Sequence, residues 1–229
     1  MKKPLALVKN DPWLEPVADE ITARFERFQQ TLHEIEENWT SLPEFANAYQ
    51  FYGFHYDRSL KGWHFREWAP HAQDVYLFGD FNDWQRYSHR LTPNRYGQWE
   101  IFLSDEQYKD RFTHQSRVKL MVHSESGWHE KIPAYIHRVV QDPATLGFSG
   151  QHWAPPRAFD WSGDHFSIRD LNELLIYECH VGMAQEREAV STFVEFADYL
   201  IPYIKNSGYN AIQLMAIAEH PYYGSFGYH

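Results

Sequence analysis

The sequence predicts a multidomain chain in which an N-terminal helical arm precedes an all-β domain and then a βαβ unit. Two observations carry this prediction. The spacing of apolar residues changes from a helical period to strict alternation near residue 49, and it changes again after residue 173. The chain has 229 residues, enough for one large domain or two smaller ones. We expect parts at 1–48, 49–156 and 174–229, with a linker at 157–173.

The arm is predicted from one apolar stripe that follows Pro16, a residue suited to the opening turn of a helix. The stripe recurs at steps of three and four residues, as one face of an α-helix requires, at Val17, Ile21, Phe25, Phe28, Leu32, Ile35 and Trp39. Two interpretations stay open. The stripe packs against the rest of the chain, or it forms the seam of a short coiled-coil dimer.

The all-β domain is predicted from three runs that alternate apolar and polar residues, beginning at Val75, Trp99 and Val118. Turn residues separate the runs, among them those at 94–97 and 125–127. Short strands with this spacing indicate an antiparallel sandwich or barrel, and a sandwich of roughly 100 residues fits the available length. We assign Trp84 and Trp99 to its core, since Trp99 falls on an alternating strand face.

The βαβ unit is predicted from two apolar runs, at 174–181 and 210–218, that flank a helix and that we expect to be buried parallel strands. Thr192 and Glu195 have the spacing of a capping box at the start of this helix, Gly208 stops it, and Pro202 is expected to kink it. A lone βαβ unit leaves strand edges open, and a (β/α)8 barrel needs roughly 250 residues. We therefore expect the chain to be a fragment of a longer protein.

The composition excludes several classes of function. Lys and Arg number 21 against 31 Asp and Glu, so the net charge of -10 disfavours binding to nucleic acid or to anionic membrane surfaces. No run of about 18 apolar residues occurs, so we expect no membrane span. With the single cysteine Cys179 no internal disulfide can form, and we expect a cytoplasmic protein. Aromatic residues make up 17%, which suggests surface rings for stacking on sugars.

Three stretches at 176–183, 208–217 and 219–229 resemble the start of the catalytic (β/α)8 TIM barrel of eukaryotic-type 1,4-α-glucan branching enzymes, in the α-amylase superfamily (glycoside hydrolase family 13). The motifs at 67–70, 79–84 and 96–100 resemble the immunoglobulin-like sandwich of that family, a family-48 carbohydrate-binding module. The resemblance implies a truncated barrel of which only the first βαβ unit is present.

The resemblance also implies a function in glycogen biosynthesis. Such glycosyltransferases cleave an α-1,4 glucosidic bond and transfer the segment to a 6-hydroxyl by a retaining mechanism, which uses two carboxyl groups ~5–5.5 Å apart. In the family these groups lie on later barrel strands, so we assign no catalytic residue and expect this fragment to bind α-glucan at most. We expect no metal and no cofactor. The expected partners are glycogen, starch and maltooligosaccharides, and the oligomeric state is left open.

Six residues are the candidates for substrate binding that the resemblance implies. In the family the tyrosine at the position of Tyr228 stacks under the sugar at subsite −1, and His229 would line the same cleft. The glucan-binding surface of the sandwich would use Trp68, Pro70, Tyr96 and Gly97, where a glycine lets sugar approach the backbone. The alternative for Trp68 is a place in the core. Gln98 stands where the family often has a basic residue, which weakens the expected contact with oligosaccharide.

The polar residues near the predicted barrel strands are interpreted as structural. Glu178 and Glu219 have no visible carboxylate partner, although Glu219 would lie on the catalytic rim. His180 and His220 lack the spacing and the third ligand of a metal site. Two other functions stay open: a non-enzymatic α-glucan-binding module, and a debranching or other α-amylase-type hydrolase. The stretch at 213–220 counts against the hydrolase.

Overall fold

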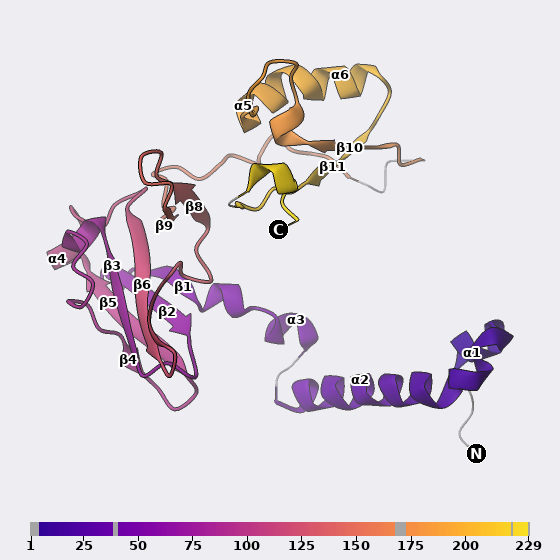
Figure 1. Cartoon of the computed structure of the whole chain (residues 1–229), viewed down its shortest axis with the longest axis horizontal. Coiled ribbons are helices and arrows are strands. Elements are labelled where there is room, and N and C mark those ends of the chain that lie inside the picture. Colours follow the sequence, from indigo (N-terminus) through magenta and orange to yellow (C-terminus); the bar gives the residue numbers. More distant parts are fainter. Residues whose placement is uncertain (1–4, 39–40, 168–172, 221, 229) are drawn as a thin grey trace. The chain divides into compact units, whose positions relative to one another are not determined.

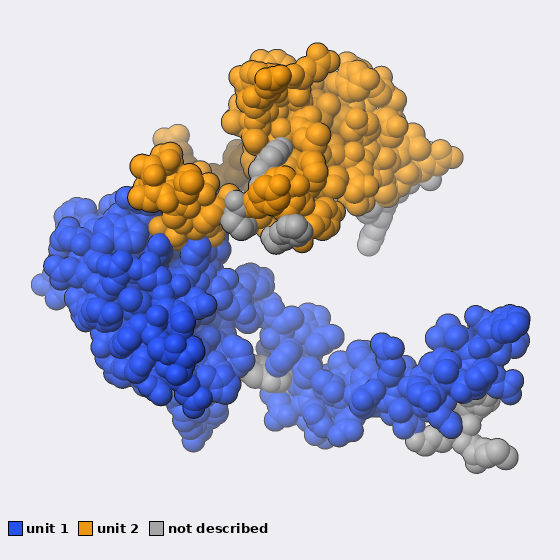
Figure 2. Space-filling model, viewed as in Figure 1, with its two compact units in different colours: residues 1–137 blue, residues 138–229 orange. Residues whose placement is uncertain are grey.

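The computed structural model describes residues 5–38, 41–167, 173–220 and 222–228 (Figure 1). The chain divides into two compact units, Met1–His137 and Arg138–His229 (Figure 2). The helical arm and two β-sheets belong to the first unit, and the βαβ unit belongs to the second. The finer domain limits expected at residues 48, 156 and 173 stay predictions. Among the described residues, no helix combines the length and the apolar character needed to cross a membrane.

The helical arm consists of short helices around one long one. Its elements are α1 (Ala6–Asn10), the 3-10 helix η1 (Pro12–Val17), α2 (Ala18–Asn38), α3 (Leu42–Phe45) and the 3-10 helix η2 (Ala48–Gln50). The prediction that Pro16 opens the long helix is wrong, because Pro16 lies inside η1 and α2 begins after it. The Asp11 side chain accepts from Trp13 N at 3.0 Å, and this cap starts the 3-10 turns earlier in the chain.

The apolar stripe of α2 is not buried within the part of the chain that the structure describes. No α2 residue is buried, and Phe25 and Phe28 are 46% and 56% exposed. Trp39, the last residue of the predicted stripe, lies outside the described residues. The described residues thus show no burial of the stripe against the rest of the chain, which was the first interpretation. The coiled-coil seam stays a prediction.

Two antiparallel sheets make up the β-sandwich of the first unit, as the alternating runs predict. One sheet has the order β1 (Gly53–Asp57), β2 (Gly62–Trp68), β5 (Gln98–Ser104), β4 (Thr92–Pro93). The other contains β3 (Asp74–Gly79), β6 (Arg117–Ser124) and β7 (Gly127–Lys131), with β6 paired to β3 and to β7. Short helices follow two strands: the 3-10 helix η3 (Asp80–Asn82) after β3 and α4 (Asp105–Tyr108) after β5.

The core lies between the two sheets and combines inward-facing strand residues with three residues of the connecting segments, Phe81, Leu91 and Phe112. It comprises Phe65, Val75, Leu77, Phe81, Leu91, Trp99, Leu103, Phe112, Val118 and Leu120. Trp99 is only 3% exposed, which confirms its place in the core. The same prediction is wrong for Trp84, which is half-buried. Its indole N–H donates to Asp80 Oδ1 at 2.9 Å, and this bond holds the ring at the turn after β3.

The second unit contains a β-hairpin and the predicted βαβ unit. The hairpin pairs β8 (Arg138–Gln141) with β9 (Phe148–Gln151). The βαβ unit pairs β10 (Ile176–His180) with β11 (Ala211–Met215) in parallel, which confirms that prediction. The helix between them comprises α5 (Phe193–Glu195), the π-helix η6 (Phe196–Leu200) and α6 (Ile201–Asn206). Two 3-10 turns complete the unit, η5 (Val181–Met183) and η7 (Tyr223–Ser225).

The helix of the βαβ unit begins and ends where the sequence predicts. Glu195 N donates to Thr192 Oγ1 at 3.2 Å and Thr192 N donates to Glu195 Oε2 at 2.8 Å, which is the predicted capping box. Gly208 takes a left-handed φ of 90° after the last turn. The irregularity expected at Pro202 takes the form of the π-helical segment just before it. A proline has no N–H and crowds the carbonyl four residues earlier, and a wider turn relieves both problems.

The strands of the βαβ unit are less buried than predicted. Neither β10 nor β11 has a buried residue, and Ile176 and Leu214 are 48% and 38% exposed. The physical reason is the small number of layers: one helix covers two strands within this unit, so apolar side chains face solvent.

Candidate functional site

The pairing of β2 with β5 brings together four candidate residues that are far apart in the sequence. Trp68 ends β2 and pairs in register with Gln98, the first residue of β5. Tyr96 and Gly97 therefore lie beside the residues that follow Trp68. Ala69 N donates to Gly97 O at 2.9 Å, and Trp68 Nε1 donates to Tyr96 O at 3.3 Å. We call the group of Trp68, Pro70, Tyr96 and Gly97 the Trp68 surface.

The rings of the Trp68 surface face solvent. Trp68 is 58% exposed and Tyr96 is 62% exposed, and Pro70 is exposed as well. The alternative that Trp68 belongs to the core is therefore wrong. The reason is the alternation along β2, in which Phe65 and Glu67 point inward and Trp68 points outward. Two exposed rings on neighbouring segments, with the Trp68 indole N–H bonded to the Tyr96 backbone carbonyl, offer apolar faces with polar edges, which suit the C–H face and the hydroxyls of a sugar.

Gly97 is required at its position by Pro70. Its φ is 77°, in the left-handed region that favours glycine. A Cβ atom at Gly97 would lie 2.5 Å from Pro70 Cα and 2.6 Å from Pro70 Cβ. The sequence suggested that this glycine lets sugar approach the backbone. In the structure, the absence of a side chain at Gly97 lets the turn before β5 pack directly against Pro70.

The side chain of Asn94 stabilises the loop of the Trp68 surface by hydrogen bonds. Its Oδ1 accepts from Tyr96 N at 2.9 Å and from Gln98 N at 3.1 Å, which is an Asx-type turn. Its Nδ2 donates to Gln98 Oε1 at 2.6 Å, and Gln98 Nε2 donates to Tyr52 Oη at 3.2 Å. Gln98, where the family often has a basic residue, is thus part of a neutral network that links the loop to the start of β1. The guanidinium of Arg95 lies 4.7 Å from the centroid of the Tyr96 ring.

Glu67 is a functional candidate that the sequence analysis missed. Its side chain is buried at 6% exposure, and its two carboxylate oxygens accept from Trp68 N at 3.1 Å and from Ala134 N at 2.9 Å. Burial raises the pKa of Glu67 above its ordinary value, and the two backbone donors oppose that shift. Glu67 therefore fixes the end of β2, from which Trp68 projects. The alternation of β2 was the available signal, because it places Glu67 on the same side as Phe65.

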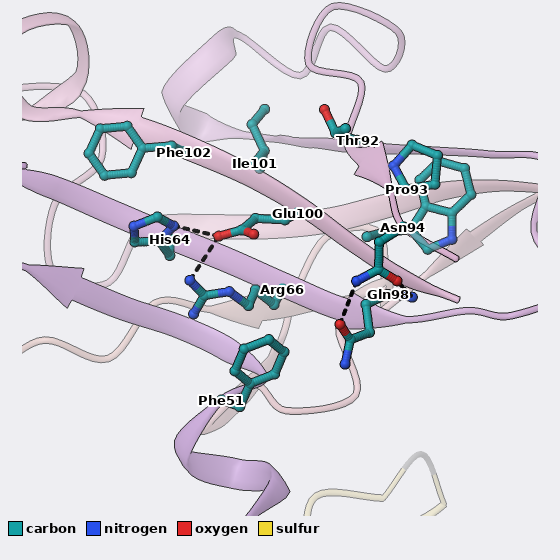
Figure 3. Close-up of a pocket in the computed structure, with 11 residues that line it drawn as sticks. Phe51, His64, Arg66, Thr92, Pro93, Asn94, Gln98, Glu100, Ile101 and Phe102 are labelled. Atoms are coloured by element: carbon teal, nitrogen blue, oxygen red, sulfur yellow. Dashed lines mark hydrogen bonds and ion pairs between the residues drawn. The ribbon is translucent and has the colours of Figure 1, made fainter. Parts of the chain in front are cut away.

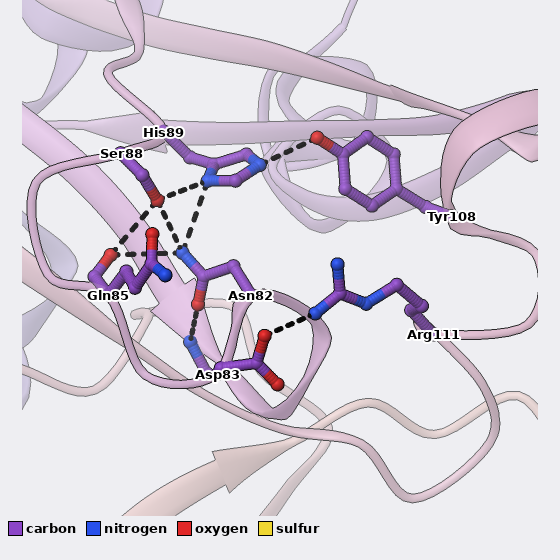
Figure 4. Close-up of polar contacts among 8 residues, drawn as sticks. Asn82, Asp83, Gln85, Ser88, His89, Tyr108 and Arg111 are labelled. Carbon is purple, nitrogen blue, oxygen red and sulfur yellow. Dashed lines mark hydrogen bonds and ion pairs between the residues drawn. The ribbon is translucent and has the colours of Figure 1, made fainter.

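A second polar cluster stabilises the loop after β3 and is built around Asn82 (Figure 4). Asn82 Oδ1 accepts from Gly79 N at 2.9 Å, and its Nδ2 donates to Ser88 Oγ and His89 Nδ1 at 2.9 and 3.1 Å. Since His89 Nδ1 accepts, its Nε2 carries the proton and donates to Tyr108 Oη at 2.7 Å. Burial lowers the pKa of His89, with a smaller contribution from Arg111. The cluster shapes the motif at 79–84 and leaves no groups for catalysis.

The residues near the barrel strands have local partners. Tyr228 is 74% exposed, and its N donates to Ser225 O at 3.1 Å. His229 lies outside the described residues. His180 Nδ1 accepts from Gly182 N at 3.2 Å, and His220 Nδ1 lies 3.0 Å from Ala218 O, so each of these two histidines contacts backbone close by in sequence. The role of Tyr228 at a sugar subsite stays a prediction.

The two carboxylates considered in the sequence analysis, Glu178 and Glu219, are both exposed. Glu178 Oε1 accepts from Gln213 Nε2 at 3.5 Å, across the paired strands, and Glu219 follows β11. Within the ranges that the structure describes, no group of three or more His, Cys, Asp and Glu side chains is placed to hold a metal ion.

The comparisons with known proteins agree with this geometry. Residues 51–136 match the family model of carbohydrate-binding module 48, the isoamylase N-terminal domain. The chain is 39% identical over 224 residues to a 1,4-α-glucan-branching enzyme of Dictyostelium discoideum, over 97% of this chain and 32% of that protein. The chain is homologous to 1,4-α-glucan-branching enzymes. A second relative, branching enzyme 2-2 (chloroplastic/amyloplastic) of Arabidopsis thaliana, is 39% identical over 220 residues, or 96% of this chain and 27% of that protein.

The chain thus spans about a third or less of the length of the branching enzymes it matches. Among solved structures, a group B Streptococcus pullulanase in complex with maltotetraose superposes with a TM-score of 0.56. The match covers 75% of this chain and 24% of the pullulanase, at 16% sequence identity. At this identity the likeness shows a shared fold and nothing more.

Proposed function

We propose that the chain is the N-terminal part of a 1,4-α-glucan-branching enzyme and that its Trp68 surface binds α-glucan. The observation that carries the proposal is the pair of exposed side chains Trp68 and Tyr96 at the end of β2, where the Trp68 indole N–H donates to the backbone carbonyl of Tyr96. The homology to branching enzymes over 97% of the chain and the family match at 51–136 support it.

In this proposal the Trp68 surface holds the donor or acceptor glucan by stacking and by hydrogen bonds. The C–H face of a glucose unit lies on the rings, while its hydroxyls bond to the loop at 94–97. The protein has a formal net charge of -10, but glucan is neutral, so binding of this kind needs no basic patch. Stacking dominates, and we expect the affinity to change little with salt.

The βαβ unit is proposed to be the first unit of a (β/α)8 barrel. Several apolar side chains of this unit are exposed, including Ile176, Tyr199 and Ile217 at 48%, 70% and 64% exposure. Further barrel strands and helices would cover them. The carboxylates that cleave and transfer glucan would come from those further strands. Tyr228 follows β11 and would lie at the catalytic rim, under the sugar at subsite −1.

Glycogen affinity electrophoresis of Trp68→Ala tests the binding surface. We expect the loss of the ring to weaken glycogen binding by at least about tenfold. Trp13→Ala is the matched control. Trp13 is also an exposed tryptophan, at 90% exposure, but it lies in the helix η1 and not on a strand that carries the Trp68 surface. Equal migration of Trp68→Ala and the unmodified protein would remove the Trp68 surface from the proposal.

The enzymatic part is tested with the complete coding sequence that contains this chain. Incubation with linear amylose should produce new α-1,6 linkages, which a branching enzyme forms by transfer. A fall in chain length without new α-1,6 linkages would instead identify a hydrolase and refute the proposed activity.

A further inference from the structure

We propose that the outward face of the β1-β2-β5-β4 sheet carries a second sugar subsite that continues the Trp68 surface and binds a further glucose unit of the same α-glucan chain. This inference rests on the proposed function. The subsite is a pocket between Phe51, at the start of the sheet, and the strand pair β2 and β5. We call it the Arg66 pocket.

The Arg66 pocket has the size and the lining of a small-ligand site. Its volume is 460 Å³, within the range of ~300–1,000 Å³ that such sites occupy. Aromatic, aliphatic and polar side chains line it together (Figure 3). Phe51 and Phe102 form two of its walls, and His64, Arg66 and Glu100 are among its polar groups. This mixture suits a ligand with apolar faces and many hydroxyls, rather than a purely apolar partner.

The register of the sheet makes the pocket continuous with the Trp68 surface. On the outward face, Arg66 pairs with Glu100 and the next outward pair is Trp68 with Gln98. Two residues of a strand span ~6.6–6.8 Å, so one step of this length separates the pocket from the Trp68 pair. Asn94 and Gln98 line the pocket and also hold the loop of Tyr96. One glucan chain can therefore run from the rings into the pocket.

The polar groups of the pocket leave one accessible acceptor, Glu100 Oε2, without a partner among the described residues. Glu100 Oε1 accepts from His64 Nδ1 at 2.5 Å and lies 2.8 Å from Arg66 Nη2. Both contacts use one oxygen, so among the described residues Oε2 of this 43% exposed carboxylate has no partner. Because a sugar hydroxyl both donates and accepts, it matches a carboxylate oxygen beside a cationic group.

The aromatic side chains hold this polar pair in place and offer rings to the ligand. The guanidinium of Arg66 lies 4.6 Å from the centroid of the Phe51 ring, and the rings of His64 and Phe102 lie 4.9 Å apart. These contacts restrict the rotamers of Arg66 and His64, so little conformational entropy is lost when a ligand binds. Phe51 is 41% exposed and is available for stacking on a sugar face.

Calorimetric titration of the 229-residue chain with glucose and maltoheptaose tests the Arg66 pocket. We expect the single sugar to occupy the Trp68 surface and the longer one to reach both sites. Glu100→Gln and Phe51→Leu should each weaken the binding of maltoheptaose by about tenfold and that of glucose by less than about twofold. Phe51→Leu keeps an apolar side chain in the pocket, so it serves as the second variant if Glu100→Gln disturbs folding.

Glu130→Gln is the matched control. Glu130 is also a carboxylate shared by two cations, Arg86 at 2.6 Å and Lys119 at 3.1 Å, but it lies on β7 in the other sheet. It should leave the affinity for both sugars unchanged.

Unchanged maltoheptaose binding by both pocket variants, or an equal loss for the two sugars, would overturn the Arg66 pocket while Trp68→Ala still tests the Trp68 surface. Absence of any binding by the unmodified chain would overturn the proposed function and the pocket together.

Discussion

Replacement of Gly97 by alanine tests whether the close contact with Pro70 requires a glycine at this position of the Trp68 surface. Two costs add up at this position. A left-handed φ costs a non-glycine residue ~1–2 kcal/mol. The new Cβ would also lie 2.5 Å from Pro70 Cα, a contact with backbone that can be relieved only by moving the chain. Overpacking of this kind typically costs ~1–3 kcal/mol, so we expect Gly97→Ala to lower the free energy of unfolding by ~2–5 kcal/mol.

Gly127→Ala separates the two costs. Gly127 has a φ of 99°, but a Cβ atom there would meet no other atom within 4 Å. Its replacement should therefore cost only the conformational part, ~1–2 kcal/mol. Urea unfolding followed by tryptophan fluorescence measures both variants, and glycogen affinity electrophoresis should show weaker binding for Gly97→Ala alone. Equal destabilisation by the two replacements would refute the role assigned to Pro70.

Three further predictions concern groups inside the sandwich. Because burial lowers the pKa of His89 below 6.5, the unfolded chain takes up the proton first, and stability should fall as the pH drops below 6.5 and through the folded pKa. His89→Gln should flatten this dependence of the urea-unfolding free energy, and a profile unchanged by the replacement would contradict it. Burial raises the pKa of Glu67 above 4.5, so its contribution is largest below pH 4.5 and is lost as the pH rises through the raised value. Glu67→Gln should remove that change, and persistence of the same slope would exclude Glu67 as its source. Leu77→Ala, at a position with 0% exposure, should cost ~2–5 kcal/mol in the same unfolding assay, and a loss below ~1 kcal/mol would place Leu77 outside the core.

Much of the fold follows from local patterns in the sequence. The alternating runs at Val75, Trp99 and Val118 became β3, β5 and β6, and the two apolar runs near the C-terminal end became a parallel pair. The capping box at Thr192 holds as predicted. Such features depend on neighbours within a few residues, so the chain order alone contains the information. The start of α2 was misplaced because a cap at Asp11 competes with the opening turn that Pro16 indicates.

The candidate site depends on contacts between distant residues. Trp68 and Tyr96 are 28 positions apart, and the register of β2 with β5 brings the Trp68 indole within hydrogen-bond distance of the Tyr96 backbone carbonyl. The same register sets Arg66 beside Glu100, a pair that no motif in the sequence marks. The sequence alone gives no reason to distinguish Glu67 from a surface carboxylate. The fold buries its side chain, which accepts a hydrogen bond from Ala134 N.

By itself, the sequence determined the order of helices and strands, the phase of the core residues and the kinship with branching enzymes, because periodicity and motifs are properties of consecutive residues. Only the tertiary structure decided that Trp68 faces solvent, that Pro70 leaves no room for a side chain at position 97, and that a polar pocket extends the Trp68 surface. Those features arise where two strands pair, and strand pairing is fixed by the packing of the whole sandwich.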